Sequence, residues 1–367
     1  MQKPHRSDKS VRFFTTVAGY GCFFILKRVF LGGKRLKKLL ATIAVLIAIV
    51  CYYTLAYQDP DQDQVDLDQD VSVGILQLVS HPSLDEIQEG IQDSFEEDGS
   101  QLEIDLQNAQ GDQNNLNTMS QRFVYQEADL MIGIATPAVQ ALANASSDIP
   151  IIMAGVTDPI EAGLMADLNQ PGGNISGVRD LTPYQDQIDL IQAILPDLSS
   201  LGIIYSSGEV NSAKQSQAAK AYAQSLGMEV KEATISSPND LIQVAAQLCQ
   251  EVDAIWVGTD NNIASAFPSL VQVANDNQVP IFPAVYEMVA SGGLATQGLS
   301  QYQIGRLSGQ MALEVLAGAD IAHLPVQDPT ETELAVNLDQ ADRLGLTISS
   351  DILEEADILI EGGQEWT

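Results

Sequence analysis

Two stretches of this sequence share one pattern of strands and helices. In residues 129–159 an Asp precedes a short apolar run, and a Thr-bearing turn and a helix-like segment then lead to a second apolar run that opens at a Pro. A looser copy of the pattern occupies residues 252–287. Apolar runs of about four to eight residues that alternate with helical periods indicate buried parallel strands joined by crossover helices. The pattern therefore predicts an α/β chain with two similar Rossmann-like lobes.

The polar turns that follow these strands are the places where such a fold binds its ligand. In an open parallel sheet, ligands lie beyond the carboxyl ends of the strands. The turns at Thr136 and Thr157 follow strands of the first copy, and those at Asp260 and Tyr286 follow strands of the second. We therefore expect the candidate site residues in these turns.

The N-terminal part of the chain differs in charge from the rest. Residues 1–60 contain ten of the 17 Lys and Arg against two acids, which leaves seven bases against 47 acids in the remainder. Residues 39–57 are an uncharged apolar run, long enough to span a bilayer, that directly follows four Lys and Arg. The positive-inside rule then predicts a basic cytoplasmic extension over residues 1–38, a transmembrane anchor over 39–57 and an extracytoplasmic body. A cleaved signal peptide is the alternative, although no small-residue cleavage site closes the run.

The composition of the remaining chain excludes several classes of function. Residues 58–70 are polar, acidic and without periodicity, which predicts a flexible linker. The acidity of the body excludes nucleic acid as a partner, because phosphate binding needs clustered Lys and Arg. Cys249 is the only cysteine of the body, so no disulfide can form within it.

Catalytic and cofactor motifs are missing from the sequence. It contains no Walker loop, no G-x-S-x-G, no G-x-G-x-x-G after the first strand and no Cys or His cluster with metal-ligand spacing. His81 stands beside Ser80, but a His and a Ser without a third partner do not make a catalytic triad. We therefore expect a binding protein without cofactor or metal, and keep an enzyme of unknown reaction and a ligand-sensing ectodomain as alternatives.

Several sequence pieces resemble the substrate-binding proteins of ABC importers, in particular the branch associated with tryptophan and tyrosine uptake. In chain order they are SHPSLDEIQEG, IATPAVQAL, PIIMAGVTDPIEAGL, PGGNISGV, LGIIYSSGEVNS, GTDNNIASA and YQIGRLSGQMALEVLAGA. The resemblance covers residues 71–348. It implies a tryptophan or other aromatic amino acid ligand, and ABC permease and ATPase subunits as partners. The anchored N-terminus resembles the membrane-tethered form of Gram-positive bacteria, which places the protein at the cell membrane.

The resemblance also implies how the body is divided. The family has two Rossmann-like lobes joined by three crossovers, and the lobes close on the ligand like a hinge. By analogy, lobe one takes residues 71–181 and 286–320, and lobe two takes residues 182–285 and 321–350. The remaining residues, 351–367, are expected to be an acidic tail with a frayed helix.

A free amino acid presents an ammonium and a carboxylate that both need partners once water is excluded. Thr136, with the N–H groups of the helix that starts after Pro137, suits a carboxylate, because helix N-termini attract anions. Asp158 and Asp260 are the candidates for the ammonium. The alternative for Thr136, Asp158 and Asp260 is that each caps the helix that follows it.

Further candidates lie at other strand ends. Ser80 follows the first strand, Thr157 precedes Asp158, and Asn261 follows Asp260. Glu209 and Asn211 belong to a turn of lobe two and are alternatively a solvated loop. Tyr286 stands at the predicted hinge, where its ring could stack on an aromatic ligand or cover the hinge.

The charge asymmetry predicts a definite topology in the membrane. Protease added to intact protoplasts should digest the body and spare a tag at the N-terminus, because the bilayer shields the cytoplasmic side. Immunoblots of the tag and of a body epitope measure this, and detergent-opened protoplasts serve as the control. Survival of the body in intact protoplasts would contradict the predicted topology.

Overall fold

The computed structural model describes residues 71–366, and its first lobe is built on a parallel sheet of five strands. All neighbouring strands of this sheet run parallel, in the order β2-β1-β3-β4-β5. The strands are β1 (Val71–Gln77), β2 (Leu102–Asn108), β3 (Leu130–Ile134), β4 (Ile151–Val156) and β5 (Ile175–Arg179). The expected strand pattern of the first sequence copy is confirmed, since β3 and β4 are almost entirely buried.

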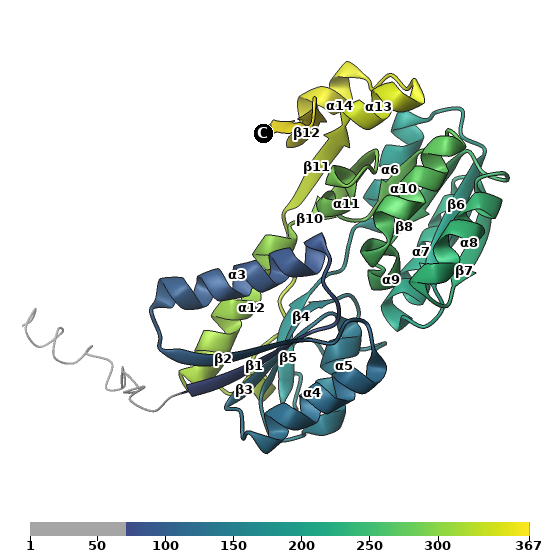
Figure 1. Ribbon diagram of the computed structural model, residues 1–367. Coiled ribbons are helices and arrows are strands. Elements are labelled where there is room, and N and C mark those ends of the chain that lie inside the picture. Colours follow the sequence, from purple (N-terminus) through teal and green to yellow (C-terminus); the bar gives the residue numbers. More distant parts are fainter. Residues whose placement is uncertain (1–70, 367) are drawn as a thin grey trace, which may run out of the picture. The chain divides into compact units, whose positions relative to one another are not determined.

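Helices cover both faces of this sheet. Helices α3 (Pro82–Asp98) and α12 (Gln301–Leu316) lie on one face, and α4 (Gln113–Tyr125) and α5 (Thr136–Ala145) on the other (Figure 1). Leu84, Ile87, Ile91 and Phe95 recur at helical spacing in α3 and are all buried. The apolar stripe that this spacing predicts therefore packs into the core of lobe one.

The second lobe repeats the design with a sheet of four parallel strands. Its order is β7-β6-β8-β9. The strands are β6 (Ser200–Ser206), β7 (Glu229–Ile235), β8 (Ala254–Val257) and β9 (Ile281–Pro283). The helices are α6 (Tyr184–Ile194), α7 (Val210–Ser225), α8 (Leu241–Leu248), α9 (Asn261–Ser265) and α10 (Phe267–Asp276), with the short 3-10 helix η2 (Pro238–Asp240) before α8. Helices α6 and α7 pack on one face of the sheet and α8 to α10 on the other.

A mixed sheet completes lobe two, and two segments of the chain lie elsewhere than the sequence predicted. Its strands are β10 (Ala295–Leu299), β11 (Thr332–Asn337), β12 (Ile358–Glu361) and β13 (Gln364–Trp366), with helices α11 (Tyr286–Ala290), α13 (Leu338–Leu344) and α14 (Ser350–Glu355) beside them. Residues 286–299 thus belong to lobe two rather than lobe one, because β10 pairs with β11 and α11 packs on the same sheet. The segment 351–366 is a helix and a hairpin rather than an acidic tail, because Ile360 adds a buried side chain to this sheet.

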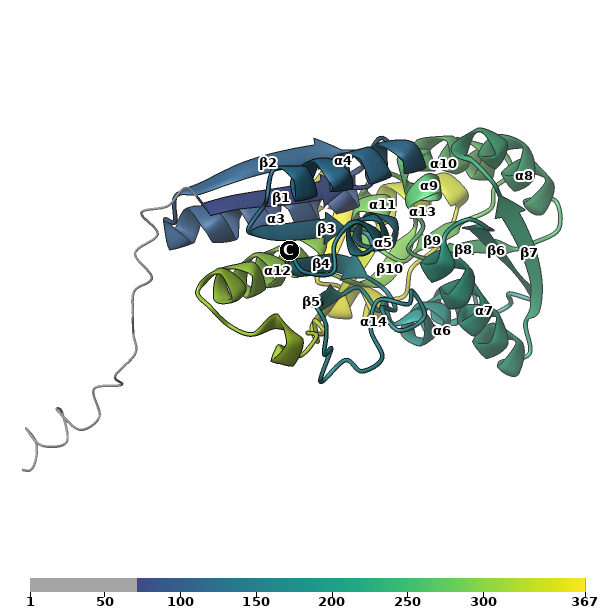
Figure 2. The same ribbon diagram turned by 90° about the horizontal axis from the view of Figure 1, so that it is seen from below.

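Three segments connect the lobes, as the resemblance implied. The first follows β5 and leads into α6, and the second leads from β10 into α12. The third leaves the 3-10 helix η3 (Ile321–His323), forms a bridge between Gln327 and Val178 of lobe one, and then enters β11. Figure 2 shows the elements of the two lobes from below.

The predicted extension, anchor and linker, residues 1–70, lie outside the described residues. Between residues 71 and 366, the longest and most apolar helices still fall short of what a membrane span requires.

Helices α3 and α12 touch through glycines. A methyl group at Gly305 of α12 would lie 2.1 Å from the carbonyl oxygen of Ile87, and one at Gly90 of α3 would lie 2.2 Å from the carbonyl oxygen of Tyr302. Both distances are far inside van der Waals contact, so only glycine allows the two backbones to approach this closely. The return of residues 301–316 to lobe one therefore depends on these two positions.

Replacing Gly305 with alanine should destabilise the protein. Over-packing of a tight contact costs about 1–3 kcal/mol, and we expect this loss to exceed the gain of about 1 kcal/mol in helix propensity. Urea unfolding monitored by circular dichroism measures the difference. The control is Gly173→Ala, because no heavy atom lies within 4 Å of a methyl group at that position. Equal stabilities of the two variants would contradict the packing argument.

Candidate functional site

The carboxyl ends of the strands in the two lobes face each other across a cleft. Thr157 follows β4 of lobe one, and its Oγ1 lies 3.2 Å from Oγ1 of Thr259, which follows β8 of lobe two. Nε2 of His81, after β1, lies 3.3 Å from Oδ1 of Asn261 at the start of α9. The turns at Thr157 and Asp260, predicted from the sequence, are therefore brought together in space, with the lobes in contact.

Two cavities lie in this cleft and share Asn261 as a wall. The smaller has a volume of about 30 Å³ and is lined by His81, Ser83, Leu84, Asp180, Thr259, Asp260, Asn261, Ala264, Val285, Met288 and Gln301. The larger has a volume of about 260 Å³ and is lined by Leu78, Val79, Gln110, Gly111, Gln113, Leu116, Pro137, Gly208, Glu209, Pro238, Asn261, Asn262 and Ser265. Both linings mix polar and apolar side chains: Asp180, His81 and Gln301 line the smaller cavity, and Leu78, Val79 and Leu116 form an apolar side of the larger one.

Asp180 places a carboxylate at the smaller cavity, in the first segment that connects the lobes. The residue is 5% exposed, and its Oδ1 has no hydrogen-bond partner among the described residues. Burial raises the pKa of this carboxyl to about 7, against a smaller lowering by the side chain of Gln301. A buried carboxylate without a partner is costly, and a cation in the cavity would supply the missing partner.

Two more buried titratable groups lie near Asp180. Burial lowers the pKa of His81, which keeps the imidazole neutral, and its Nδ1 lacks a partner among the described residues. Burial also raises the pKa of Glu287 in α11 to about 7, with smaller contributions from Glu86 and Asp180, and its Oε2 is unpartnered in the same sense. This end of the cleft therefore holds two buried carboxyl groups and a neutral imidazole, and these three groups bring no positive charge to balance a carboxylate.

The start of α5 provides donors at the other side of the cleft. Thr136 is 3% exposed, and its Oγ1 has no partner within the described part of the chain. Ala135 just before it has φ 77° and ψ 154°, a conformation that costs a non-glycine residue about 1–3 kcal/mol. Pro137 lines the larger cavity. The strained turn thus holds the N-terminus of α5 and an unused hydroxyl beside that cavity.

Glu209 and Asn211 are buried in the cleft wall of lobe two, and the solvated-loop alternative does not apply to them. Glu209 accepts hydrogen bonds from the backbone and side-chain N–H groups of Asn261 and Asn262, between 2.6 and 3.2 Å. Burial first, and the nearby Asp260 second, raise the pKa of Glu209 to about 7. Asn211 donates to the carbonyl of Thr259, while its Oδ1 has no partner among the described residues.

Hydrogen bonds within their own lobes engage Asp260, Asp158 and Ser80, and Asp260 caps α9 as the capping alternative expected. Asp260 accepts from Ile263 N, from Ser206 and from Ser212, so both of its oxygens are engaged inside lobe two. Oδ1 of Asp158 accepts from the backbone N–H groups of residues 160 and 161, each at 3.1 Å. Ser80 is exposed and donates to Asp85 of α3 at 2.9 Å. These side chains shape the turns, which leaves the ammonium to another carboxylate.

Tyr286 lies at the start of α11 and packs against Val289, Ala335 and Ile360 of lobe two. It is not among the residues that line either cleft cavity. Burial and the neighbouring Glu365 raise the pKa of its hydroxyl. The structure therefore favours the interpretation of Tyr286 as a cover for the mixed sheet.

Sequence reasoning missed Asp180, Glu287 and Gln301. For Asp180 a signal existed in the sequence, since it is an acid at the end of a short apolar run, Ile175–Arg179 (β5), as Asp158 and Asp260 follow the ends of β4 and β8. Glu287 and Gln301 carry no such signal, because only the chain path between the lobes brings them to the cleft. Within residues 71–366, His, Cys, Asp and Glu form no group of three that could hold a metal ion.

Comparison with known proteins gives one family for most of the chain. The family model "ABC transporter substrate binding protein" matches residues 72–360. A tyrosine-binding protein of Clostridioides difficile is 38% identical over 283 residues, which cover 76% of this chain and 82% of that protein. An uncharacterized protein of Rickettsia prowazekii is 26% identical over 266 residues, which cover 72% of this chain and 82% of that protein.

Solved structures show the same similarity. An ABC domain from Streptococcus pneumonia in complex with L-Trp is 43% identical, with a TM-score of 0.78, and the match covers 80% of this chain and 100% of that chain. The ligand-free, open structure of a substrate-binding protein with adhesive properties from Clostridium difficile is 34% identical, with a TM-score of 0.62, over 79% of this chain and 99% of that chain.

The raised pKa of Asp180 predicts a pH-dependent difference between the wild type and Asp180→Asn without ligand. Between about pH 4 and pH 7 the folded wild type holds a proton that the unfolded chain, with a carboxyl pKa of about 4, releases. Wild-type stability relative to Asp180→Asn should therefore rise as the pH falls from 7 through this window. Urea unfolding at several pH values measures it, with the exposed Glu96→Gln as control. A stability difference between the wild type and Asp180→Asn that does not change with pH would contradict the raised pKa of Asp180.

Proposed function

The chain belongs to the family of ABC transporter substrate-binding proteins, and on this premise we propose that it captures tryptophan or another aromatic amino acid between its lobes. The L-Trp complex of the 43% identical structure and the tyrosine-binding relative support this ligand class. The protein holds its ligand without changing it chemically. The observation that carries the proposal is the buried, unpartnered carboxylate of Asp180 in the cleft.

Asp180 receives the ammonium of the ligand. Burial disfavours the charge and raises the pKa of its carboxyl to about 7, so the group is easier to protonate in the empty cleft than an exposed Asp. An ammonium at hydrogen-bond distance reverses this preference, so binding ionises the carboxyl and releases its proton. Gln301, at the start of α12, lines the same cavity as Asp180. Because Asp180 lies in a connecting segment, the ligand contacts the region about which the lobes move.

Thr136 and the N-terminus of α5 receive the carboxylate. The helix dipole favours an anion at this position, and the hydroxyl of Thr136 is the donor. Pro137 has no N–H, and the N–H groups of residues 138 and 139 already donate to the carbonyl of Ala135. The strained backbone of Ala135 persists because the turn holds the donors in place. The ammonium and carboxylate sites thus come from different parts of the cleft.

The larger cavity receives the aromatic ring. Leu78, Val79, Leu116 and Pro137 give it an apolar side, and the backbone of Gly111 and Gly208 leaves room between the lobes. Burying an aromatic ring contributes through the apolar area removed from water. A ring in this cavity and an ammonium at Asp180 require both lobes to be in place around one ligand.

Lobe closure is held by a few polar contacts that an open form would lose. Besides the Thr157–Thr259 and His81–Asn261 contacts, Nζ of Lys214 in lobe two lies 3.0 Å from Oε2 of Glu161 in lobe one. The ion pair is about half exposed and therefore contributes little on its own. The ligand supplies the main free energy of closure by contacting both lobes.

The proposal extends to the place of the protein in transport. The apolar run over residues 39–57 anchors it in the cell membrane with the body outside, and the closed body delivers its ligand to an ABC permease driven by an ATPase. The basic flank before residue 39 supports this orientation. Family membership supports the transport partners.

Calorimetry with matched ligands tests the proposal on the full-length chain. Tryptophan should bind more tightly than tryptamine, which lacks the carboxylate, and than indole-3-propionate, which lacks the ammonium. Asp180→Asn should weaken tryptophan binding by about 2–5 kcal/mol, the range for removing one partner of a buried charge pair. It should change the binding of indole-3-propionate far less.

Asp158→Asn is the control variant, because the carboxylate of Asp158 is engaged in its own turn. It should leave tryptophan affinity within a few tenths of a kcal/mol, as for a surface substitution. Equal losses in the Asp158 and Asp180 variants would sink the assignment of Asp180. A protein that binds none of the aromatic amino acids would sink the proposed ligand class.

A further inference from the structure

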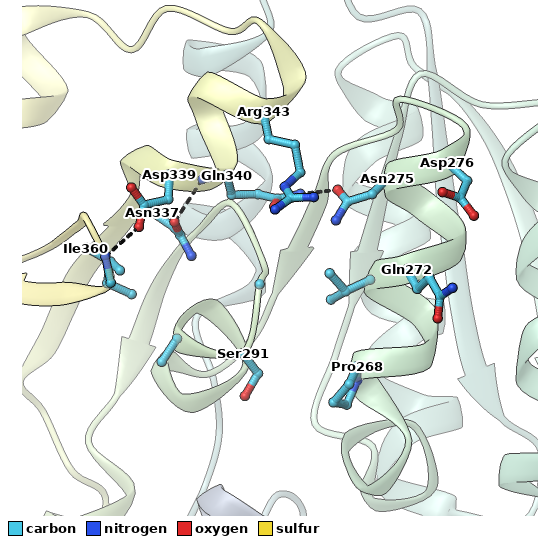
Figure 3. Close-up of a pocket in the computed structure, with 14 residues that line it drawn as sticks. Pro268, Gln272, Asn275, Asp276, Ser291, Asn337, Asp339, Gln340, Arg343 and Ile360 are labelled. Carbon is cyan, nitrogen blue, oxygen red and sulfur yellow. Dashed lines mark hydrogen bonds between the residues drawn. The ribbon is translucent and has the colours of Figure 1, made fainter.

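A second cavity of ligand size lies in lobe two, apart from the cleft. We call it the Arg343 groove, and its volume is about 510 Å³. Its lining residues are Pro268, Val271, Gln272, Asn275, Asp276, Ala290, Ser291, Gly292, Asn337, Asp339, Gln340, Arg343, Ile360 and Gly363. They come from α10, the turn after α11, α13 and the β12–β13 hairpin, and none of them lines either cleft cavity (Figure 3). Because all of these elements belong to lobe two, opening of the lobes does not divide the groove.

Internal contacts hold the walls of this groove in place. Asn337 donates to the carbonyl of Val289 and accepts from the backbone N–H of Gln340. Both oxygens of Asp339 accept backbone N–H groups of the hairpin, at residues 362 and 363, each at 2.8 Å. Gly292 has φ 113°, and a methyl group there would lie 2.7 Å from Cγ1 of Val271. The groove is therefore formed by fixed packing, and glycine at position 292 is needed to keep its floor open.

Arg343 stands out among the basic residues of the body. Residues 71–367 contain seven Lys and Arg. Six of them form ion pairs with carboxylates, namely Arg122, Arg179, Lys214, Lys220, Lys231 and Arg306. Arg343 alone forms neither an ion pair nor a hydrogen bond within the described residues, although acids greatly outnumber bases in the body. A guanidinium left unpaired in such acidic surroundings is available to an anion from outside.

The groups beside Arg343 favour a ligand that also carries hydroxyls. Figure 3 shows Arg343 extending from α13 toward Gln340 and Asn275, which hydrogen-bond each other. That bond uses Nε2 of Gln340 and Oδ1 of Asn275, so Oε1 of Gln340 and Nδ2 of Asn275 remain as an acceptor and a donor. A hydroxyl both donates and accepts, and it can satisfy such a pair of groups.

The charge of the lining selects the kind of anion. Asp276 and Asp339 also line the groove, so a doubly charged phosphate would meet more repulsion than a singly charged carboxylate. The guanidinium fork matches the two oxygens of a carboxylate. We propose that the Arg343 groove is an accessory binding site for a hydroxylated carboxylate, such as a sugar acid, and that Arg343 binds its carboxylate. This site acts independently of the amino acid in the cleft.

Sodium gluconate and sorbitol, which differ in the carboxylate, test the proposal on the full-length chain. Calorimetry should show gluconate binding and much weaker sorbitol binding. Hydrogen–deuterium exchange with mass spectrometry should show protection by gluconate in residues 268–276 and 337–343. Equal binding of the two probes, or protection elsewhere in the chain, would overturn the proposal.

Two substitutions, one that removes a positive charge and one that removes a negative charge, should change gluconate affinity in opposite directions. Arg343→Gln should weaken gluconate binding by about tenfold or more, since it removes a charge-assisted hydrogen bond. Asp276→Asn should strengthen it, because a repelling carboxylate is removed from the lining. Arg122→Gln, which breaks an ion pair on lobe one, should leave it unchanged. Unchanged affinity in Arg343→Gln would overturn the role of Arg343. Protection of the groove by an acidic tripeptide and not by gluconate would show a protein-docking surface instead.

Discussion

Parallel pairing of the buried strands is the constraint on which this structure depends. It requires a helix after each strand, and it places all strand carboxyl ends of a lobe at one edge of its sheet. Two such lobes, linked by three segments, turn these edges toward each other. The polar turns, the cleft and the contacts between Thr157 and Thr259 all follow from that arrangement. The close glycine contact between α3 and α12 then fixes how the chain returns to lobe one after its second crossing.

The cleft contains buried polar atoms for which the protein itself provides no partner. Asp180, Thr136 and Asn211 each leave such an atom unpaired among the described residues. Asp260 and Glu209, by contrast, are occupied by backbone and side-chain donors of their own lobe. Polar groups with hydrogen-bond partners in their own lobe form the cleft walls, and polar groups without a partner are free to bind a ligand. An amino acid, with an ammonium, a carboxylate and an apolar side chain, matches the second set in charge and position.

Acidity affects both sites of the molecule. In the cleft, burial raises the pKa of the Asp180 carboxyl to about 7, and the proposed ammonium of the ligand would supply its counterion. On lobe two, the ion pairs of the other six bases leave the positive charge of Arg343 as the local exception. The two proposals thus assign a cationic group to the cleft and an anionic group to the Arg343 groove of one strongly acidic chain. The two sites use opposite charges and separate elements.

The sequence alone determined the alternation of strands and helices, because apolar runs and helical periods are local properties. It also indicated the segments that carry Thr136, Thr157, Glu209 and Asn211, since each begins where a strand ends. The sequence left open which carboxylate was free, because capping and ligand binding use the same residue types at the same positions. Only the tertiary structure decided this: hydrogen bonds occupy Asp158 and Asp260, whereas burial in a connecting segment leaves Asp180 unpaired. Pairing between β10 and β11 likewise placed residues 286–299 in lobe two, because contacts between distant strands have no local signature.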